Sequence, residues 1–135
     1  MDNEFHVGFT GSRSGINSVQ VKEIARFLAS MKDLQLVVHH GDCIGADTDF
    51  HNLCLSISPG VKIVIHPPTI NTFRAFNKSH KLLPPKPYLV RNHDIVDAAD
   101  IVIACPVDKN KEELRSGTWA TIRYCKKQGK TIYIY

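Results

Sequence analysis

The amino-acid sequence predicts an α/β fold with a parallel five-stranded sheet and helices on both faces. Strand-like and helix-like segments alternate along the chain, which is typical of parallel sheets with crossover helices. The run from Ile101 to Cys105 is apolar at every position, as in a strand covered on both faces. Glycine-containing turns follow three predicted strands. Ligands bind such sheets at the carboxyl edge, where the strand order reverses, so we expect these turns to converge there.

The first half of the chain predicts three strands and two helices. The strands are expected at residues 5–9, 36–39 and 62–65. A helix over 18–31 has apolar residues at helical spacing, and Asn17 with Gln20 three residues later forms a capping-box pattern at its start. A second helix, over 46–58, is followed by Pro59 and Gly60, which end it.

The second half is less regular at first. Five prolines between His66 and Tyr88 exclude a long helix or a central strand there. A short helix is expected over 91–98, a strand over 101–105, a helix over 118–128 that ends at Gly129, and a fifth strand over 131–135.

Length and composition indicate one globular domain, covering residues 1–135. Hydrophobic residues make up 43% and charged residues 22% of the chain, which is ordinary for a globular protein. No apolar run could span a bilayer, and the acidic start has no signal-peptide pattern, so we expect a cytoplasmic protein with no membrane partner. The net charge of +4 is dispersed, which favours a small anionic ligand over nucleic acid.

The four cysteines lie in or beside apolar segments and form no C-x-x-C pair, so we expect buried thiols in a reducing compartment. A zinc site is the less favoured alternative, because the spacing of its candidate ligands matches no standard pattern. Those candidates are His39, His40, Cys43, His51 and His66. We therefore expect neither a metal nor a cofactor.

The turn after the apolar strand is the best single candidate for an anion site. Pro106 ends the strand, and Arg115, Ser116, Gly117 and Thr118 stand where the last helix begins. The first N–H groups of a helix have no partner within it, and they attract anions together with a hydroxyl and a guanidinium. This segment is the predicted phosphate-binding loop.

Two further turns have the same layout. Thr10, Gly11, Ser12 and Arg13 follow the first predicted strand, and a solvent-exposed arginine in an ordinary turn is the equally favoured alternative there. The second strand is followed by Gly41, Asp42, Gly45, Ala46 and Asp47. Asp42 is a candidate acceptor for a ribose or a base. Asp47 is expected to cap the helix rather than to act in catalysis, and His51 either packs beneath the loop or contacts the ligand.

Four more residues are placed near the same edge. Pro67 follows the third strand, Arg74 lies in the irregular segment, and Arg91 with Asn92 opens the short helix. The catalytic candidates are Arg91, Asp42 and Glu113, although Glu113 lies in a charged segment and a solvated role is favoured for it.

Taken together, these motifs resemble the SLOG superfamily, which has a Rossmann-like fold. The segment from His40 to Asp47 is similar to the glycine-rich turn of DNA-processing protein A. Arg91 stands where the Lonely Guy phosphoribohydrolases place an active-site arginine, and Pro106 with Gly117 and Thr118 resembles their P-G-G-x-G-T signature. The resemblance covers nearly the whole chain and implies a nucleotide ligand. It also implies a homodimer or larger homo-oligomer.

The chain departs from the phosphoribohydrolase pattern at the residues that would act on the ribose. That family carries glutamates just after the Gly-Thr pair, where this chain has Ala120 and Thr121. Three hypotheses follow. The leading one is a sensor or sequestering domain that binds a phosphorylated nucleoside or an ADP-ribose-type nucleotide. The alternatives are a hydrolase cleaving the N-glycosidic bond of nucleoside monophosphates, with Asp42, Asp47 or Glu113 supplying the carboxylate, and a nucleic-acid-binding module.

Overall fold

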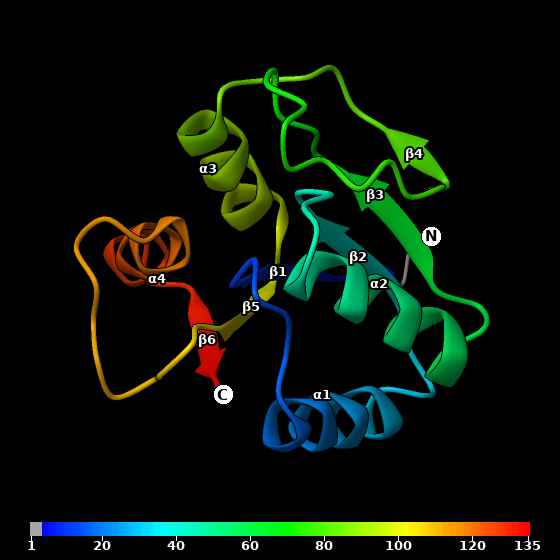
Figure 1. Ribbon diagram of the computed structural model, residues 1–135. Coiled ribbons are helices and arrows are strands. Elements are labelled where there is room, and N and C mark those ends of the chain that lie inside the picture. Colours follow the sequence, from blue (N-terminus) through cyan, green and yellow to red (C-terminus); the bar gives the residue numbers. More distant parts are fainter. Residues whose placement is uncertain (1–3) are drawn as a thin grey trace.

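The computed structural model describes residues 4–135, which form a sheet covered by two helices on each face (Figure 1). The elements in chain order are β1 (Glu4–Gly11), α1 (Ser18–Ser30), β2 (Gln35–His40), α2 (Ala46–Ile57), β3 (Lys62–Ile65), β4 (Lys81–Leu82), α3 (Tyr88–Ala98), β5 (Ile101–Cys105), α4 (Gly117–Lys127) and β6 (Thr131–Ile134). Each long predicted element is present, and no end is shifted by more than three residues.

The described residues form a six-stranded parallel sheet rather than the five-stranded sheet that the sequence predicts. The strand order is β4-β3-β2-β1-β5-β6, and every neighbouring pair is parallel. The additional strand, β4, pairs Lys81 and Leu82 with the last two residues of β3. It has no periodic pattern of its own, and the prolines that follow limit it to two residues at the sheet edge.

The strand order reverses between β1 and β5. From β1 the chain adds β2, β3 and β4 on one side, then crosses to add β5 and β6 on the other. The carboxyl ends of β1 and β5 are neighbours, since Gly11 is in register with Cys105. A ligand site in a sheet of this kind is expected at this switch point.

The core lies on both faces of the sheet. On one face α1 and α2 pack against β1, β2 and β3, and the Phe9 and Phe50 rings stack with their centroids 4.2 Å apart. On the other face α3 and α4 cover β5, where Val102 packs with Val96 and Cys125. Every residue of β5 is buried, which confirms that this apolar strand is covered on both faces.

The capping box that the sequence predicts at the start of α1 is present. The Asn17 side chain accepts the Gln20 N–H at 2.8 Å, and the Gln20 side chain accepts the Asn17 N–H at 2.9 Å. Gln20 is also buried, and its amide donates to the backbone oxygens of Pro106 and Tyr135. The start of α1 is thereby attached to the ends of β5 and β6.

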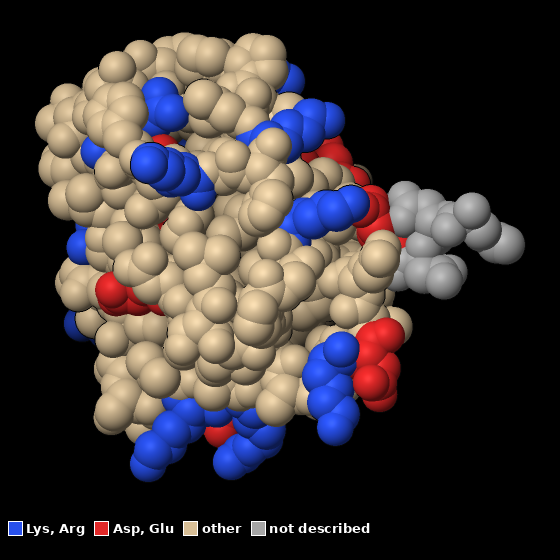
Figure 2. All heavy atoms as spheres, turned by 90° about the vertical axis from the view of Figure 1, so that its right-hand side faces the viewer, with Lys and Arg blue, Asp and Glu red and all other residues tan. Residues whose placement is uncertain are grey.

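Charged residues are scattered over the surface near the β3–β4 edge. Figure 2 shows separate Lys and Arg side chains there, divided by uncharged residues and by Asp or Glu, with no continuous basic patch on that face. Within the described part of the chain, no helix is both long and apolar enough to cross a bilayer.

Candidate ligand-binding site

A cavity of about 810 Å³ lies at the switch point of the sheet. Its floor contains Phe9, Thr10 and Gly11 at the end of β1, and Pro106 just after β5. The start of α3 and the start of α4 form its walls. The volume falls within the range of small-molecule sites, about 300–1,000 Å³.

Most of the sequence-predicted site residues meet in this cavity although they come from five separate segments. Those lining it are Thr10, Gly11, Ser12, Arg13, Gly41, Asp47, Arg91, Asn92, Pro106, Glu113, Arg115, Ser116, Gly117 and Thr118. The other predicted site residues do not line this cavity; they are Asp42, Gly45, Ala46, Pro67 and Arg74.

The start of α4 provides backbone donors on one wall. Ser116 is the N-cap and accepts the Trp119 N–H at 3.2 Å, and the helical bonds begin with the Ala120 N–H to Ser116 O. The N–H groups of Gly117 and Thr118 precede that first bond, so the helix gives them no acceptor. A Cβ built on Gly117 would meet nothing within 4 Å. The backbone there is open to an approaching anion.

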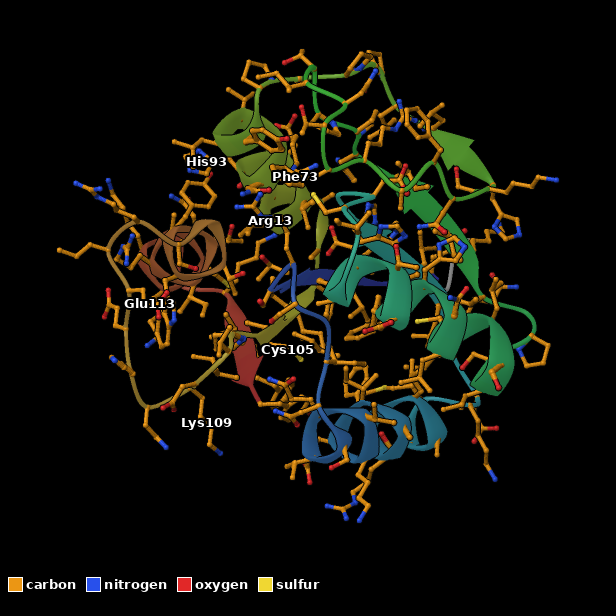
Figure 3. All side chains as sticks on the ribbon, in the orientation of Figure 1. Arg13, Phe73, His93, Cys105, Lys109 and Glu113 are labelled. Atoms are coloured by element: carbon orange, nitrogen blue, oxygen red, sulfur yellow. The ribbon has the colours of Figure 1, made fainter. Side chains whose placement is uncertain are left out.

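The loop after β1 is fixed to the rest of the fold while its arginine is exposed. The Ser12 N–H donates to Cys105 O, and Ser12 O accepts the Ala46 N–H, which joins the ends of β1 and β5 and the start of α2. The Arg13 guanidinium carbon lies 4.0 Å from the centroid of the Phe73 ring, and both side chains line the cavity. Figure 3 shows the two side chains beside each other between α2 and α3.

Arg91 is buried, with 5% of its surface exposed, and is held mainly by the protein itself. Its Nη1 donates to Gly41 O at 2.6 Å and to His66 O at 3.0 Å, and its Nη2 lies 3.3 Å from Cys43 Sγ. It therefore joins α3 to the ends of β2 and β3. Within residues 4–135, none of the cavity arginines Arg13, Arg91 and Arg115 has a carboxylate within ion-pair distance.

Asp47 is a buried carboxylate on the cavity wall rather than the cap of α2. The N-cap position is Gly45, and the Asp47 carboxylate instead accepts the Cys43 N–H at 3.1 Å from the preceding loop. Burial raises the pKa of Asp47 to about 6, while the positive charge of Arg91 and the Cys43 N–H oppose that rise. Burial likewise raises the pKa of the Cys43 thiol. A carboxyl group that titrates near neutrality inside a cavity is typical of functional sites.

Asp42 has a structural role that the sequence does not predict. It is fully buried, and its carboxylate accepts bonds from Arg74 Nε at 3.1 Å and from the N–H and amide of Asn77 at 3.0 Å. Its oxygens are occupied by the segment that carries Phe73, so they do not face a ligand. Arg74 is engaged in this ion pair and also stacks on Phe76.

Packing explains why three other predicted site residues, Gly45, Ala46 and Pro67, do not line the cavity. Gly45 and Ala46 lie under the loop after β1: Gly45 has φ 88°, and a Cβ on it would lie 2.1 Å from Arg13 O. Ala46 is fully buried, and its Cβ would be 2.5 Å from a Cβ on Gly11. Pro67 is buried at the end of β3, where its carbonyl oxygen accepts the Lys86 N–H.

Five histidines lie within hydrogen-bond distance of one another, as a group of three and a pair. His39 Nδ1 lies 2.9 Å from His66 Nε2, His39 Nε2 lies 2.8 Å from His6 Nδ1, and His40 Nε2 lies 2.9 Å from His51 Nδ1. Burial lowers the pKa of His39 and His40 to about 3 and that of His66 to about 4. His51 thus packs beneath the loop. No trio of His, Cys, Asp or Glu side chains among residues 4–135 is arranged to hold a metal ion.

Several cavity residues were not predicted from the sequence. Phe73, Tyr88, Leu89 and Ile95 line the cavity together with Cys43. Phe73 lies in the proline-rich irregular segment, whose path has no periodic signal. Helix α3 begins at Tyr88, three residues before the predicted start, and Pro87 is its N-cap, where the missing N–H removes no bond within the helix. That earlier start brings Tyr88 and Leu89 to the cavity wall.

Comparison with known proteins supports the fold assignment. No family model matches the sequence, and no curated protein matches it. Among solved structures, the molybdenum cofactor binding protein from Rippkaea orientalis superposes with a TM-score of 0.72 at 14% identity, covering 97% of this chain and 76% of that one. The structural-genomics target TM1055 gives 0.65 at 16% identity, covering 95% and 72%.

A third similar structure is DNA processing protein A from Helicobacter pylori, described for its single-stranded DNA binding mode. It gives a TM-score of 0.65 at 17% identity, covering 96% of this chain, which spans 64% of that protein. The likeness to these three structures shows that the chain shares their α/β fold, in agreement with the parallel sheet that the sequence predicts.

Proposed function

We propose that this chain binds a phosphorylated nucleoside or an ADP-ribose-type nucleotide in the switch-point cavity, as a sensor or sequestering domain. The observation that carries the proposal is the open start of α4. Two N–H groups without helical acceptors, an unobstructed Gly117 and the Ser116 hydroxyl lie on the wall of a cavity large enough for a nucleotide.

The charges around the cavity favour an anionic ligand. Arg13 and Arg115 are exposed on its wall without carboxylate partners among the described residues, and Arg91 lies buried behind it. The acidic residues on the wall are Asp47, Asp108 and Glu113. Two of these belong to the loop that ends at α4, and Figure 3 shows Glu113 beside α4, apart from Arg13 and Phe73. A phosphate at Gly117 would therefore face the start of α4 and Arg115, while Arg13 lies across the cavity beside Phe73.

The similar structures lend support of a general kind. One is a cofactor-binding protein and another binds single-stranded DNA, which is built of phosphorylated nucleosides. A binding role, rather than catalysis, is favoured because Ala120 and Thr121 follow the Gly-Thr pair and supply no carboxylate.

A second candidate function rests on Asp47. Its buried carboxyl lines the same cavity, and burial raises its pKa to about 6, which suits a proton donor near neutral pH. This group would supply the carboxylate for cleaving the N-glycosidic bond of a nucleoside monophosphate.

The proposed function is tested by calorimetry with a panel of nucleoside mono- and diphosphates and ADP-ribose. We expect at least one to bind and to raise the melting temperature. In the variant Gly117→Asp the fold is retained, because the position has open space and an acidic residue suits the first turn of a helix. The new carboxylate would repel the phosphate, so we expect the affinity to fall about tenfold or more.

Gly60→Asp is the matched control for this variant. Gly60 also has no atom near its Cβ position, and it lies in the turn before β3, away from the cavity. It should bind the nucleotide like the unmodified chain. Failure of every nucleotide to bind would reject the proposal, and tight, steeply salt-dependent binding of an oligonucleotide would favour a nucleic-acid-binding module instead.

A further inference from the structure

We infer that Phe73 determines ligand specificity, by extending the Arg13–Phe73 stack to the planar ring of the ligand. This inference rests on the proposed function and adds the chemical class of the part of the ligand that lies away from the phosphate. The phosphate would be held at the start of α4, and a flat aromatic heterocycle, rather than a bare sugar, would be read at the opposite wall.

The first observation is that the stack lies in the cavity itself. Phe73 lines the cavity and is 37% exposed, although it is a large apolar side chain. The guanidinium of Arg13 lies 4.0 Å from the ring centroid, and Arg13 lines the same cavity. A planar cation against an aromatic face offers stacking to a heterocycle without selecting one base over another.

The second observation is that the backbone around Phe73 is held by hydrogen bonds to the loop after β2. Its carbonyl oxygen accepts the Ile44 N–H at 2.8 Å, and the Ala75 N–H donates to Asp42 O at 2.7 Å. The Asp42 carboxylate also accepts hydrogen bonds from Arg74, which follows Phe73 in the chain, and from Asn77. An aromatic platform that is ordered before binding loses less conformational entropy when the ligand arrives.

The third observation is backbone strain in the same contacts. Asp42 has φ 58° and Phe76 has φ 57°, and these are the two non-glycine residues with positive φ within residues 4–135. A bulky side chain such as Phe76 seldom adopts this conformation, and strained residues gather at ligand clamps. The fixed position of Phe73 is thus maintained against a local conformational cost.

The experiment compares AMP with ribose 5-phosphate, which shares the phosphate and lacks the base. In Phe73→Ala we expect AMP affinity to fall about five- to hundredfold, as for other stacked bases, while ribose 5-phosphate affinity stays unchanged. Phe73→Trp keeps a stacking surface and should retain AMP binding. Circular dichroism and the melting temperature establish that each variant is folded.

Phe76→Ala is the matched control. Phe76 lies in the same segment, is 59% exposed and also stacks on an arginine, Arg74, but it does not line the cavity. This variant should bind both probes like the unmodified chain.

Each outcome decides between the two proposals. If Phe73→Ala lowers the affinity for AMP and for ribose 5-phosphate equally, or lowers neither, Phe73 does not contact the ring. The inference is then wrong, while the proposal of nucleotide binding stands. If the unmodified chain binds ribose 5-phosphate as tightly as AMP, the phosphate site stands without a ring platform. If it binds no nucleotide, both proposals fail. An unfolded Phe73→Ala leaves the decision to Phe73→Leu, which keeps apolar bulk and should still lose the preference for AMP.

Discussion

At the scale of single residues, the glycines of the candidate site divide into two groups. From the sequence, all of them are expected to let a ligand approach the backbone closely. A Cβ on Gly11 or Gly41 would lie 2.5 Å from Ala46 or from the Arg91 guanidinium, so these positions make room for the protein's own side chains. Gly117 alone among the cavity glycines has open space beside it. The difference depends on neighbours that are distant in sequence.

Asp47 provides a residue-scale test of the catalytic alternative. If the chain cleaves nucleoside monophosphates, Asp47→Asn should reduce the release of free base about a hundredfold or more, because the amide cannot transfer a proton. The amide oxygen can still accept the Cys43 N–H, so nucleotide affinity should change little. The measurement is chromatographic detection of free base together with calorimetry.

Glu113→Gln is the matched control, since Glu113 is an exposed carboxylate on the same cavity wall. It should leave any cleavage unchanged. Loss of cleavage in Glu113→Gln, with normal cleavage in Asp47→Asn, would move the catalytic role to Glu113. No free base from the unmodified chain would leave binding as the function.

At the scale of elements, the start of α1 combines a local cap with a long-range contact. The reciprocal bonds of Asn17 and Gln20 are local and follow from the residue pattern. The Gln20 amide also donates to Pro106 O at 2.8 Å and to Tyr135 O at 3.1 Å, and these partners lie 86 and 115 residues away. A single substitution can separate the two roles.

Gln20→Glu should keep the cap and lose the long-range contact. The new carboxylate can still accept the Asn17 N–H, but it faces two backbone oxygens with no hydrogen to donate. We expect the free energy of unfolding to fall by about 2–4 kcal/mol, through unsatisfied acceptors and a buried charge. Asn17→Ala, which removes only the local cap, should cost about 1 kcal/mol. Equal losses in urea denaturation would show that the long-range contact contributes little.

At the scale of the whole molecule, the buried histidines make stability depend on pH. The folded chain holds His39 and His40 with pKa values of about 3 and His66 with a pKa of about 4, against 6.5 in the unfolded chain. At pH values between the folded and unfolded pKa, the unfolded state binds more protons than the folded state. The stabilising contribution of the three histidines is therefore complete above pH 6.5 and is lost as the pH falls. By pH 5, each of these histidines should lower the free energy of unfolding by about 2 kcal/mol.

Asp47 acts in the opposite direction. Its pKa is raised from 3.8 to about 6, so its contribution is complete at low pH and is lost as pH rises through 6. The three histidines together change the free energy of unfolding more than Asp47 does. Urea denaturation should therefore show the free energy of unfolding decreasing from pH 7.5 to pH 5. In Asp47→Asn the fall should be steeper. A flat stability profile over this range would contradict the account.

Much of the fold could be predicted from the sequence because its elements have strong local signals. The period of the apolar residues, the capping pair and the uniformly apolar strand at Ile101 mark the long elements. Strand β4 could not be predicted, because two residues at a sheet edge carry no period. The sequence predicts too late a start for α3, because prolines normally interrupt regular elements, whereas Pro87 stands at the N-cap of the helix.

The sequence by itself determined the fold class, the order of the long elements and the turns that meet at the carboxyl edge. These features follow from local patterns and from the handedness of parallel crossovers. The tertiary structure alone decided which of the turn residues face the cavity. The Asp42 carboxylate binds Arg74 and Asn77, Asp47 lies on the cavity wall, and Phe73 stacks against Arg13. The physical reason is that a polar or aromatic side chain contacts the partner that packing brings to it, and the partners of Asp42 and Phe73 lie tens of residues away in the chain.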